Sequence, residues 1–74
     1  MYTIYTQNLC GYCHMAKDLL KKNRIEFMEI SLDYDESARK LLKEMGCNTV
    51  PQIFDEEQHI GGYNDLKLKL TENI

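Results

Sequence analysis

The chain has 74 residues, of which 43% are hydrophobic, and nine Lys and Arg against twelve Asp and Glu give it a net charge of −3. At this length folding buries only about 60% of the surface that the unfolded chain exposes, so we expect a single small domain, residues 1–74. Charges of both signs are interspersed, which argues against nucleic-acid binding, and no apolar run approaches the roughly 18 residues that span a membrane.

The first half of the chain predicts a strand, a helix and a second strand. Residues 2–6 are β-branched and aromatic, which favours a strand. Residues 11–22 predict a helix, because their apolar side chains recur on one helical face. These side chains are Ala16, Leu19 and Leu20. Asn23 and Arg24 end that helix, and residues 25–30 predict a strand that is covered on both faces, because its apolar and polar residues alternate only partly.

The second half begins with the clearest helical pattern in the sequence, in which apolar residues fall at i, i+3, i+4 and i+7. They are Ala38, Leu41, Leu42 and Met45. Either Asp33 or Asp35 is available to cap this helix, and Gly46 is expected to end it. Residues 52–54 and 58–60 flank a polar turn and predict a hairpin.

The last segment, residues 63–70, is ambiguous, because its alternating leucines also fit a strand. With this segment taken as a helix, the element order is β-α-β-α-β-β-α. The first βαβ unit predicts parallel strands, and the hairpin makes the sheet mixed. The predicted fold is therefore thioredoxin-like α/β, with a four-stranded mixed sheet flanked by helices. The expected core residues are Tyr2, Ile4, Phe27, Ile30, Leu41, Leu42, Ile53 and Phe54.

Cysteines carry most of the chemical information, since Cys10 and Cys13 form a CxxC pair and Cys47 stands alone. The N-terminus lacks a signal-peptide pattern, so we expect a cytoplasmic protein, in which close thiols indicate catalysis or metal binding rather than a permanent disulfide. At a helix start, free N–H groups and the helix dipole favour a thiolate at Cys10, while Cys13 is expected to be more buried. Two non-equivalent thiols suit disulfide exchange, in which one attacks and the other releases the mixed disulfide.

Two other interpretations of these cysteines stay open at this point. The motif matches the CxxCH pattern of c-type haem attachment, which would require export and an axial partner. Cys10, Cys13 and Cys47, with either His14 or His59, also make a Cys₃His set that suits zinc. Structural zinc sites use closely spaced ligand pairs, whereas Cys47 is isolated, so redox chemistry is favoured and no metal site is predicted.

Motifs across nearly the whole chain, in order and at matching spacing, resemble the glutaredoxin family, especially its short bacterial and phage members. They are residues 5–6 (YT), 10–14 (CGYCH), 16–17 (AK), 49–54 (TVPQIF) and 59–66 (HIGGYNDL). The combination is more specific than CxxC alone. The resemblance implies a glutathione-dependent thiol–disulfide oxidoreductase that reduces protein disulfides and glutathione mixed disulfides.

The resemblance also implies roles for individual residues. Cys10 would attack the glutathionylated substrate and Cys13 would resolve the mixed disulfide. Pro51 would be cis, and the Val50 backbone would pair with the tripeptide like an added strand. The implied glutathione-binding residues are Gln7, Tyr12, Thr49, Val50, Pro51, Gly62, Asn64 and Asp65.

Several of these positions also have a simpler explanation. Asp65 could act only as a helix cap, although the helix start that follows the double glycine also offers N–H groups to the γ-glutamyl carboxylate. Tyr12 could be an exposed loop aromatic. We expect His14 and His59 to be surface or partly packed residues without a catalytic role, and Cys47 to be a half-exposed thiol near the site.

Two positions depart from the family pattern. Gly11 stands where the family commonly has proline, so the loop is less rigid. Some relatives without this proline hold a glutathione-ligated [2Fe–2S] cluster between two subunits, and that alternative stays open. Gln7 stands where many members carry Lys or Arg facing the glycyl carboxylate of glutathione, so the charge-assisted part of that hydrogen bond is lost.

We therefore expect a monomeric, cytoplasmic glutathione–disulfide oxidoreductase with glutathione as co-substrate and no tightly bound cofactor. From the family, ribonucleotide reductase is a plausible client protein. The alternatives from other classes are an iron–sulfur cluster carrier and a thioredoxin-like electron donor that is served by a flavin reductase. Gln7 keeps the second of these open, because the residue lacks the cation that the family places beside glutathione.

Overall fold

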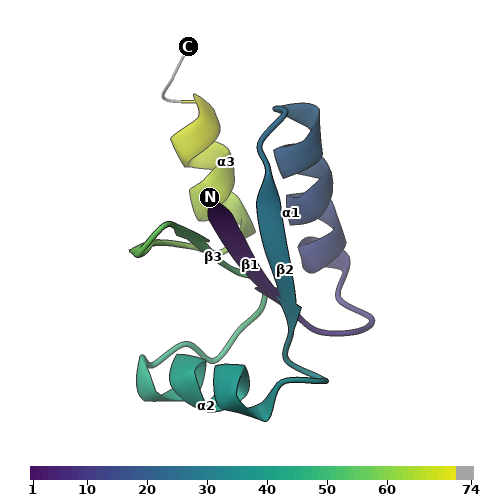
Figure 1. Cartoon of the computed structure of the whole chain (residues 1–74). Helices are drawn as coiled ribbons and strands as arrows, with labels where there is room; N and C mark the ends of the chain where they lie inside the picture. The colour runs from purple at the N-terminus through teal and green to yellow at the C-terminus, as the bar shows by residue number, and fades with distance from the viewer. Residues whose placement is uncertain (72–74) are drawn as a thin grey trace.

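The computed structural model describes residues 1–71, which form four strands and three helices in the predicted order (Figure 1). The elements are β1 (Tyr2–Thr6), α1 (Gly11–Lys22), β2 (Phe27–Ser31), α2 (Glu36–Glu44), β3 (Gln52–Asp55), β4 (Gln58–Gly61) and α3 (Tyr63–Thr71). The ambiguous last segment is thus a helix, with Leu66 buried and Leu68 exposed.

The four strands form one mixed sheet in the order β2-β1-β3-β4. β1 runs parallel to β2, with Ile4 opposite Glu29, and antiparallel to β3, with Ile4 opposite Ile53. β3 and β4 pair as an antiparallel hairpin whose register shifts between Ile53 and Phe54. The prediction of a thioredoxin-like, four-stranded mixed sheet is confirmed.

α1 and α2 both end in a Schellman motif, which explains where the strands after them begin. Arg24 has a φ of +57°, and the Ile25 N–H donates to the Leu20 carbonyl at 2.9 Å. Because Ile25 completes the end of α1, β2 begins at Phe27, two residues later than predicted. At the end of α2, Gly46 has a φ of +81° and the Cys47 N–H donates to the Leu42 carbonyl at 2.8 Å, as expected of a terminating glycine.

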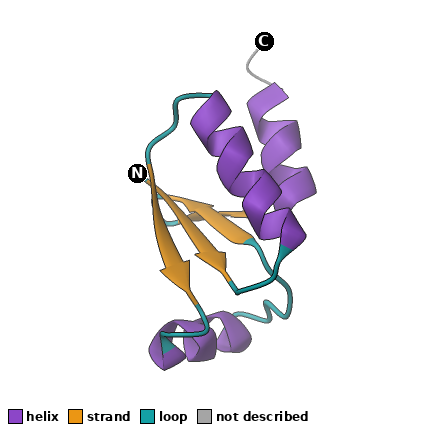
Figure 2. Ribbon diagram, turned by 90° about the vertical axis from the view of Figure 1, so that its right-hand side faces the viewer, coloured by secondary structure: helices purple, strands orange, loops and turns teal. Residues whose placement is uncertain are grey.

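α1 and α3 pack side by side over one face of the sheet (Figures 1 and 2). The core between these layers consists of fully buried side chains from the sheet, from α1 and from α3. They are Ile4, Ala16, Leu20, Ile53 and Leu66. Since Ile4 and Ile53 are directly opposite each other on neighbouring strands, the two helices pack against the centre of the sheet.

α2 lies across the lower end of the sheet in Figure 1 and buries a smaller cluster of side chains. Its Ala38 and Leu42 are buried, and Tyr5, Ile30 and Phe54 of the strands pack against this cluster. The prediction that Leu41 belongs to the core is wrong, because this side chain is 48% exposed. A nine-residue helix at the end of the sheet buries only the narrow stripe at i and i+4, so the position at i+3 faces solvent.

Asp35 caps α2 and is the one of the two candidate caps that the fold uses. Its carboxylate accepts hydrogen bonds from the Ala38 N–H at 3.0 Å and from the Ser37 hydroxyl at 2.7 Å. The Ser37 hydrogen bond, followed by that from Ala38, lowers the pKa of Asp35. Asp33 instead accepts the Asn8 N–H at 2.5 Å, which ties the loop after β1 to the loop after β2.

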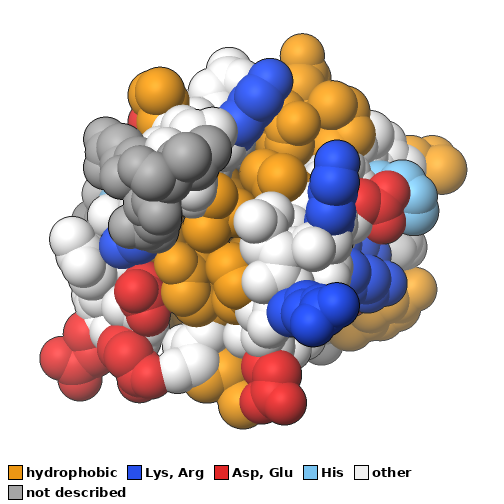
Figure 3. All heavy atoms as spheres, turned by 90° about the horizontal axis from the view of Figure 1, so that it is seen from above, with side chains coloured by type: hydrophobic (Ala, Val, Ile, Leu, Met, Phe, Trp, Pro, Cys, Tyr) orange, Lys and Arg blue, Asp and Glu red, His pale blue; other side chains and the backbone are white. Residues whose placement is uncertain are grey.

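The surface carries both signs of charge. The face shown in Figure 3 has Lys and Arg as well as Asp and Glu side chains around exposed apolar atoms. It therefore does not present the uniformly basic surface that nucleic-acid binding requires. Across residues 1–71, no helix combines the length and the apolar character that crossing a membrane demands.

Two neighbouring leucines of α2 test the assignment of its buried face. Leu42→Ala should lower the free energy of unfolding by about 2–5 kcal/mol, because it leaves a cavity at a side chain that is 2% exposed. Leu41→Ala, the matched control, should change it by less than about 1 kcal/mol. Urea unfolding of the two variants measures both values, and equal losses would contradict this orientation of α2.

The Asp35 cap predicts a dependence of stability on pH. Because folding lowers the pKa of this carboxyl, its contribution is complete above the unfolded value of about 3.9 and is lost as the pH falls through the folded value. Asp35→Asn keeps a side chain that can cap but does not titrate. The difference in urea midpoint between wild type and Asp35→Asn should therefore shrink on acidification; a difference that is the same at neutral pH and at about pH 2 would contradict this role.

Candidate active site

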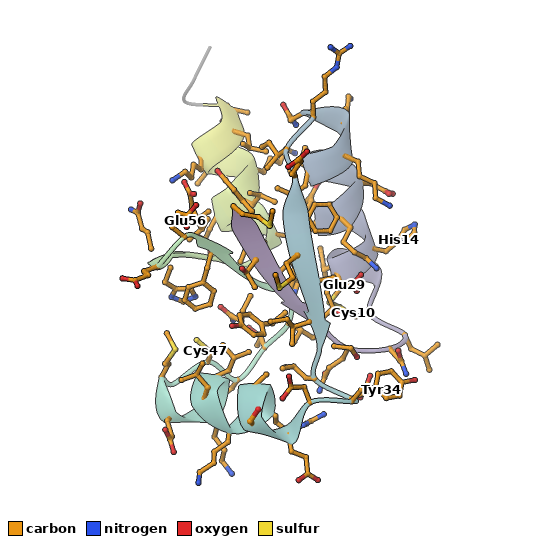
Figure 4. All side chains as sticks on the ribbon, viewed as in Figure 1. Cys10, His14, Glu29, Tyr34, Cys47 and Glu56 are labelled. Carbon is orange, nitrogen blue, oxygen red and sulfur yellow. A yellow bond between two sulfur atoms is a disulfide. The ribbon has the colours of Figure 1, made fainter. Side chains whose placement is uncertain are left out.

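Cys10 lies where β1 passes into α1, at the end of the sheet above α2 (Figure 4), and Cys13 follows in the first turn of α1. Cys10 is the N-cap of α1, with an extended backbone (φ −111°, ψ 106°), and its Sγ accepts the Cys13 N–H at 3.1 Å. The two cysteines are joined as a disulfide with their Cα atoms 5.2 Å apart. Cys10 is half-buried, whereas Cys13 is only 2% exposed, so the two sulfurs differ in access as exchange chemistry requires.

The start of α1 stabilises negative charge on the sulfur of Cys10 once the disulfide is reduced. The sulfur occupies the position of a capping oxygen, at the positive end of the helix dipole. The first turn of α1 contains no acidic residue that would oppose this effect. A Cβ added to Gly11 would have no atom within 4 Å, so packing does not require glycine at this position.

The loop after α2 lies against the disulfide. The Val50–Pro51 peptide bond is cis, which confirms the expectation from the family resemblance. The Val50 carbonyl oxygen is 3.9 Å from Cys10 Sγ. Pro51 is buried, and the backbone of Val50 lies beside the Cys10 sulfur.

Gln52 holds this loop in place, and sequence reasoning did not identify it. Its side-chain amide is 6% exposed and donates to the Thr49 carbonyl at 3.0 Å and to the Thr49 hydroxyl at 3.2 Å. The amide oxygen of Gln52 lies 2.7 Å from His59 Nε2. The His59 ring stacks on Phe54 with their centroids 4.7 Å apart. A glutamine in a short strand carries no sequence signal for such a role, because the role depends on the path of the neighbouring loop.

A groove of about 300 Å³ lies beside this loop and brings together most of the residues that the family resemblance implied for glutathione. It is lined by Tyr12, Thr49, Val50, Pro51, Gly62, Tyr63, Asn64 and Asp65. Tyr63 was not predicted; its ring centroid is 6.0 Å from that of Tyr12. Gln7 is the predicted residue that does not line this groove. It lines two other hollows, one shared with Cys10 and Cys13 and one shared with Thr49 and Val50.

Asp65 has the capping role that was its simpler explanation. Its Oδ2 accepts the Gly62 N–H at 3.0 Å at the start of α3. A Cβ at Gly61 would collide with this carboxylate, and Gly61 has a φ of +121°, so both space and backbone conformation require glycine there. The cap leaves Asp65 as a wall of the groove, with a negative charge at that end.

A larger hollow, of about 760 Å³, lies on the other side of the disulfide. Glu29, which lines it, accepts hydrogen bonds from the Thr6 hydroxyl at 2.8 Å and from Lys17 Nζ at 3.1 Å. The Thr6 hydrogen bond, and then Lys17, lower the pKa of Glu29. Tyr34 is largely exposed at the rim of the hollow, where Asn8 Nδ2 donates to its hydroxyl at 3.3 Å (Figure 4).

The side chains of Cys47 and the two histidines make other contacts, and none of their hydrogen bonds and ion pairs within residues 1–71 involves Cys10 or Cys13. Cys47 is a half-buried free thiol whose Sγ is 3.9 Å from His59 Nε2. His14 is exposed, and its Nε2 is 3.4 Å from Asp18 Oδ2. Within residues 1–71, no three His, Cys, Asp or Glu side chains come together as a metal-binding group, so the Cys₃His set considered for zinc is not assembled there.

Comparisons with known proteins agree with this geometry. The family model of glutaredoxin matches residues 2–60. Glutaredoxin 3 of Escherichia coli K12 is 47% identical over 64 residues, which cover 85% of this chain and 77% of that protein. The family match includes the segment with Cys10 and Cys13, strands β1 to β3 and the loop with Pro51.

Solved structures extend the similarity to the fold as a whole. A buckwheat glutaredoxin–glutathione complex matches with a TM-score of 0.84 at 28% identity, covering 97% of this chain and 69% of that one. The glutaredoxin-like NrdH-redoxin of Escherichia coli, described as having a thioredoxin-like activity profile, matches with a TM-score of 0.83 at 25% identity over 93% and 91% of the two chains. With its cysteine pair in the active-site position of these proteins, the chain belongs to the glutaredoxin family and is a thiol–disulfide oxidoreductase.

Proposed function

We propose that this oxidoreductase uses glutathione as its reductant, with Cys10 as the nucleophile and Cys13 as the resolving thiol. The observation that carries the proposal is the groove beside Cys10, which contains seven of the eight residues implied for glutathione. The Val50 N–H has no hydrogen-bond partner among residues 1–71. An extended tripeptide could therefore pair with Val50 as an added strand while its own sulfur meets Cys10.

The difference in access between the two sulfurs supports the order of the steps. The Cys10 thiolate attacks a client disulfide, forms a mixed disulfide and releases one client thiolate. Cys13 then attacks Cys10 Sγ, which releases the second client thiolate and leaves the Cys10–Cys13 disulfide seen in the structure. One glutathione thiolate reopens this bond at Cys10, and a second takes the glutathionyl group away as glutathione disulfide. Each step exchanges one S–S bond for another.

The rest of the proposed site follows from the groove. Tyr12 and Tyr63 form an apolar wall, and the start of α3, with Asn64 and Asp65, suits the γ-glutamyl end, which carries both an ammonium and a carboxylate. We further propose a monomer that acts in the cytoplasm, where glutathione keeps thiols reduced. Disulfide-bearing proteins such as ribonucleotide reductase are the proposed clients.

A second candidate is a thioredoxin-like donor that is served by a flavin reductase. The similarity to NrdH-redoxin favours it, as does Gln7, a neutral residue beside the site. In this case the same cysteines would perform the same exchange with the client, and only the source of electrons would differ.

Coupled turnover distinguishes the two reductants. With a mixed disulfide of glutathione as substrate, NADPH oxidation should proceed with glutathione plus glutathione reductase and should be slow with thioredoxin reductase alone. The physical reason is that the groove matches a tripeptide rather than a second protein. Faster turnover with thioredoxin reductase would overturn the proposal and favour the thioredoxin-like donor.

Serine variants test the assignment of the two sulfurs. Cys10→Ser should abolish all exchange, because it removes the nucleophile. Cys13→Ser should retain the reduction of a glutathionylated peptide, which needs only Cys10, and should lose the reduction of protein disulfides. A Cys13→Ser enzyme as inactive as Cys10→Ser toward the glutathionylated peptide would show that the roles are wrongly assigned; Cys47→Ser, with activity near that of wild type in both assays, is the control.

A further inference from the structure

His59 of β4 contacts two side chains of β3 on one face of the sheet. It is directly opposite Phe54 in the register of the hairpin, and the two rings stack with an interplanar angle of 27°. Gln52 is two residues from Phe54 on β3, so its side chain leaves the strand on the same face. The stack therefore holds the imidazole where its Nε2 meets the Gln52 amide oxygen at 2.7 Å.

The hydrogen bonds of Gln52 decide which nitrogen of His59 carries a hydrogen. The Thr49 carbonyl can only accept, so the Gln52 group that faces it at 3.0 Å is the NH₂ nitrogen. The amide oxygen consequently faces His59, and this oxygen also can only accept. His59 Nε2 is therefore the donor of the 2.7 Å hydrogen bond, and the neutral ring has its hydrogen on Nε2 and none on Nδ1.

The hydrogen bond from His59 stabilises one orientation of a buried amide. Gln52 is 6% exposed, and its NH₂ group donates to the carbonyl and the hydroxyl of Thr49 while its oxygen accepts from His59. Without the His59 donor, the oxygen would stay unpaired in a buried place, or the amide would turn and break its hydrogen bonds to Thr49. The imidazole thus favours the orientation of the amide that holds Thr49.

Thr49 and Val50 depend on this side chain because they lie between regular elements. α2 ends at Glu44 and β3 begins at Gln52. In the part of the chain that the structure describes, neither Thr49 nor Val50 makes a backbone–backbone hydrogen bond. Their position nevertheless matters, because the Val50 carbonyl oxygen is 3.9 Å from Cys10 Sγ.

We propose that His59 is a positioning residue for the exchange reaction and acts through the Gln52 amide. The Nε2–H of His59 fixes the amide, the amide fixes Thr49, and the adjoining Val50 backbone keeps its place beside the Cys10 sulfur. The inference rests on the proposed function, because it needs a glutathionyl group to pair with Val50. His59 does not line the groove itself, so it should affect the binding of the substrate rather than the rate of sulfur transfer.

Single-turnover kinetics with two mixed disulfides of one fluorescent peptide test the inference. In one probe the peptide thiol carries glutathione, and in the other it carries 2-mercaptoethanol, which has no backbone to pair with Val50. With either probe, the Cys10 thiolate of the reduced enzyme attacks the sulfur of the small thiol, forms a disulfide with it and releases the peptide as thiolate. The fluorescence change reports the half-saturating probe concentration and the maximal rate.

His59→Phe keeps a ring over Phe54 but removes the Nε2 donor. It should raise the half-saturating concentration of the glutathione probe roughly two- to tenfold, the range that one hydrogen bond supplies. The maximal rate and the reaction of the mercaptoethanol probe should change little. His59→Gln, whose amide can donate from a similar position, should retain most of the wild-type affinity. Gln58→Phe is the matched control, since Gln58 is exposed, precedes His59 on β4 and points to the opposite face.

Two further measurements test the route through the amide. Gln52→Met removes the donor and the acceptor together, so His59→Phe in that background should cause no further loss of affinity. Long-range ¹H–¹⁵N spectra of the wild-type imidazole, recorded well above the pH range in which histidine titrates, should show a hydrogen on Nε2 and none on Nδ1. These spectra need no variant, so they test the assignment even where a substitution prevents folding.

The outcomes separate the inference from the proposed function. A neutral His59 ring without a hydrogen on Nε2 would overturn the inference, and so would wild-type affinity in His59→Phe while wild type prefers the glutathione probe. An equal loss in Gln58→Phe or in His59→Gln, or an equal loss with both probes, would overturn it as well, because the effect would then be a general disturbance of β4. If wild type reacts with the glutathione probe no better than with the mercaptoethanol probe, the proposed glutathione site itself is wrong.

Discussion

The contact between α1 and the centre of the sheet determines where the Cys10 sulfur lies. Ala16 and Leu20 pack on Ile4 and Ile53 without exposed surface, and this fixes both the direction of α1 and the point at which it begins. Cys10 is the residue at that point, so its sulfur takes the place of a capping oxygen and accepts the Cys13 N–H. One hydrophobic contact thus positions a polar site at the surface, which suits a chain too short to enclose a deep one.

The second constraint comes from the loop between α2 and β3. Buried Gln52 binds Thr49 at two atoms, and the Val50 carbonyl oxygen in the same loop is 3.9 Å from Cys10 Sγ. The backbone of Thr49 and Val50 consequently forms a ridge with a hollow on either side. The two hollows differ in charge, because one is lined by Asp65 and the other by Arg39 and Lys43.

Local patterns predicted most of the fold because each is decided by neighbours in sequence. Capping by Asp35 and the ends of both early helices follow from short-range hydrogen bonds. The wrong predictions concern residues whose environment depends on packing or on chain geometry beyond the local pattern. Leu41 fits the helical repeat but is 48% exposed, because the residues that α2 buries are Ala38 and Leu42. Ile25 fits a strand but completes the end of α1.

The sequence by itself determined the chemistry of this protein: a CxxC pair at a helix start, a Val–Pro step and a double glycine before the last helix. These are properties of residue type and spacing, so they can be recognised without knowledge of the tertiary structure. Only the tertiary structure decided which side chains hold and flank the loop beside Cys10. Gln52 binds Thr49 of this loop, and Tyr63 lines the groove next to it. Both come from elements distant in sequence from Cys10, so their positions depend on how β3 and α3 pack in the fold.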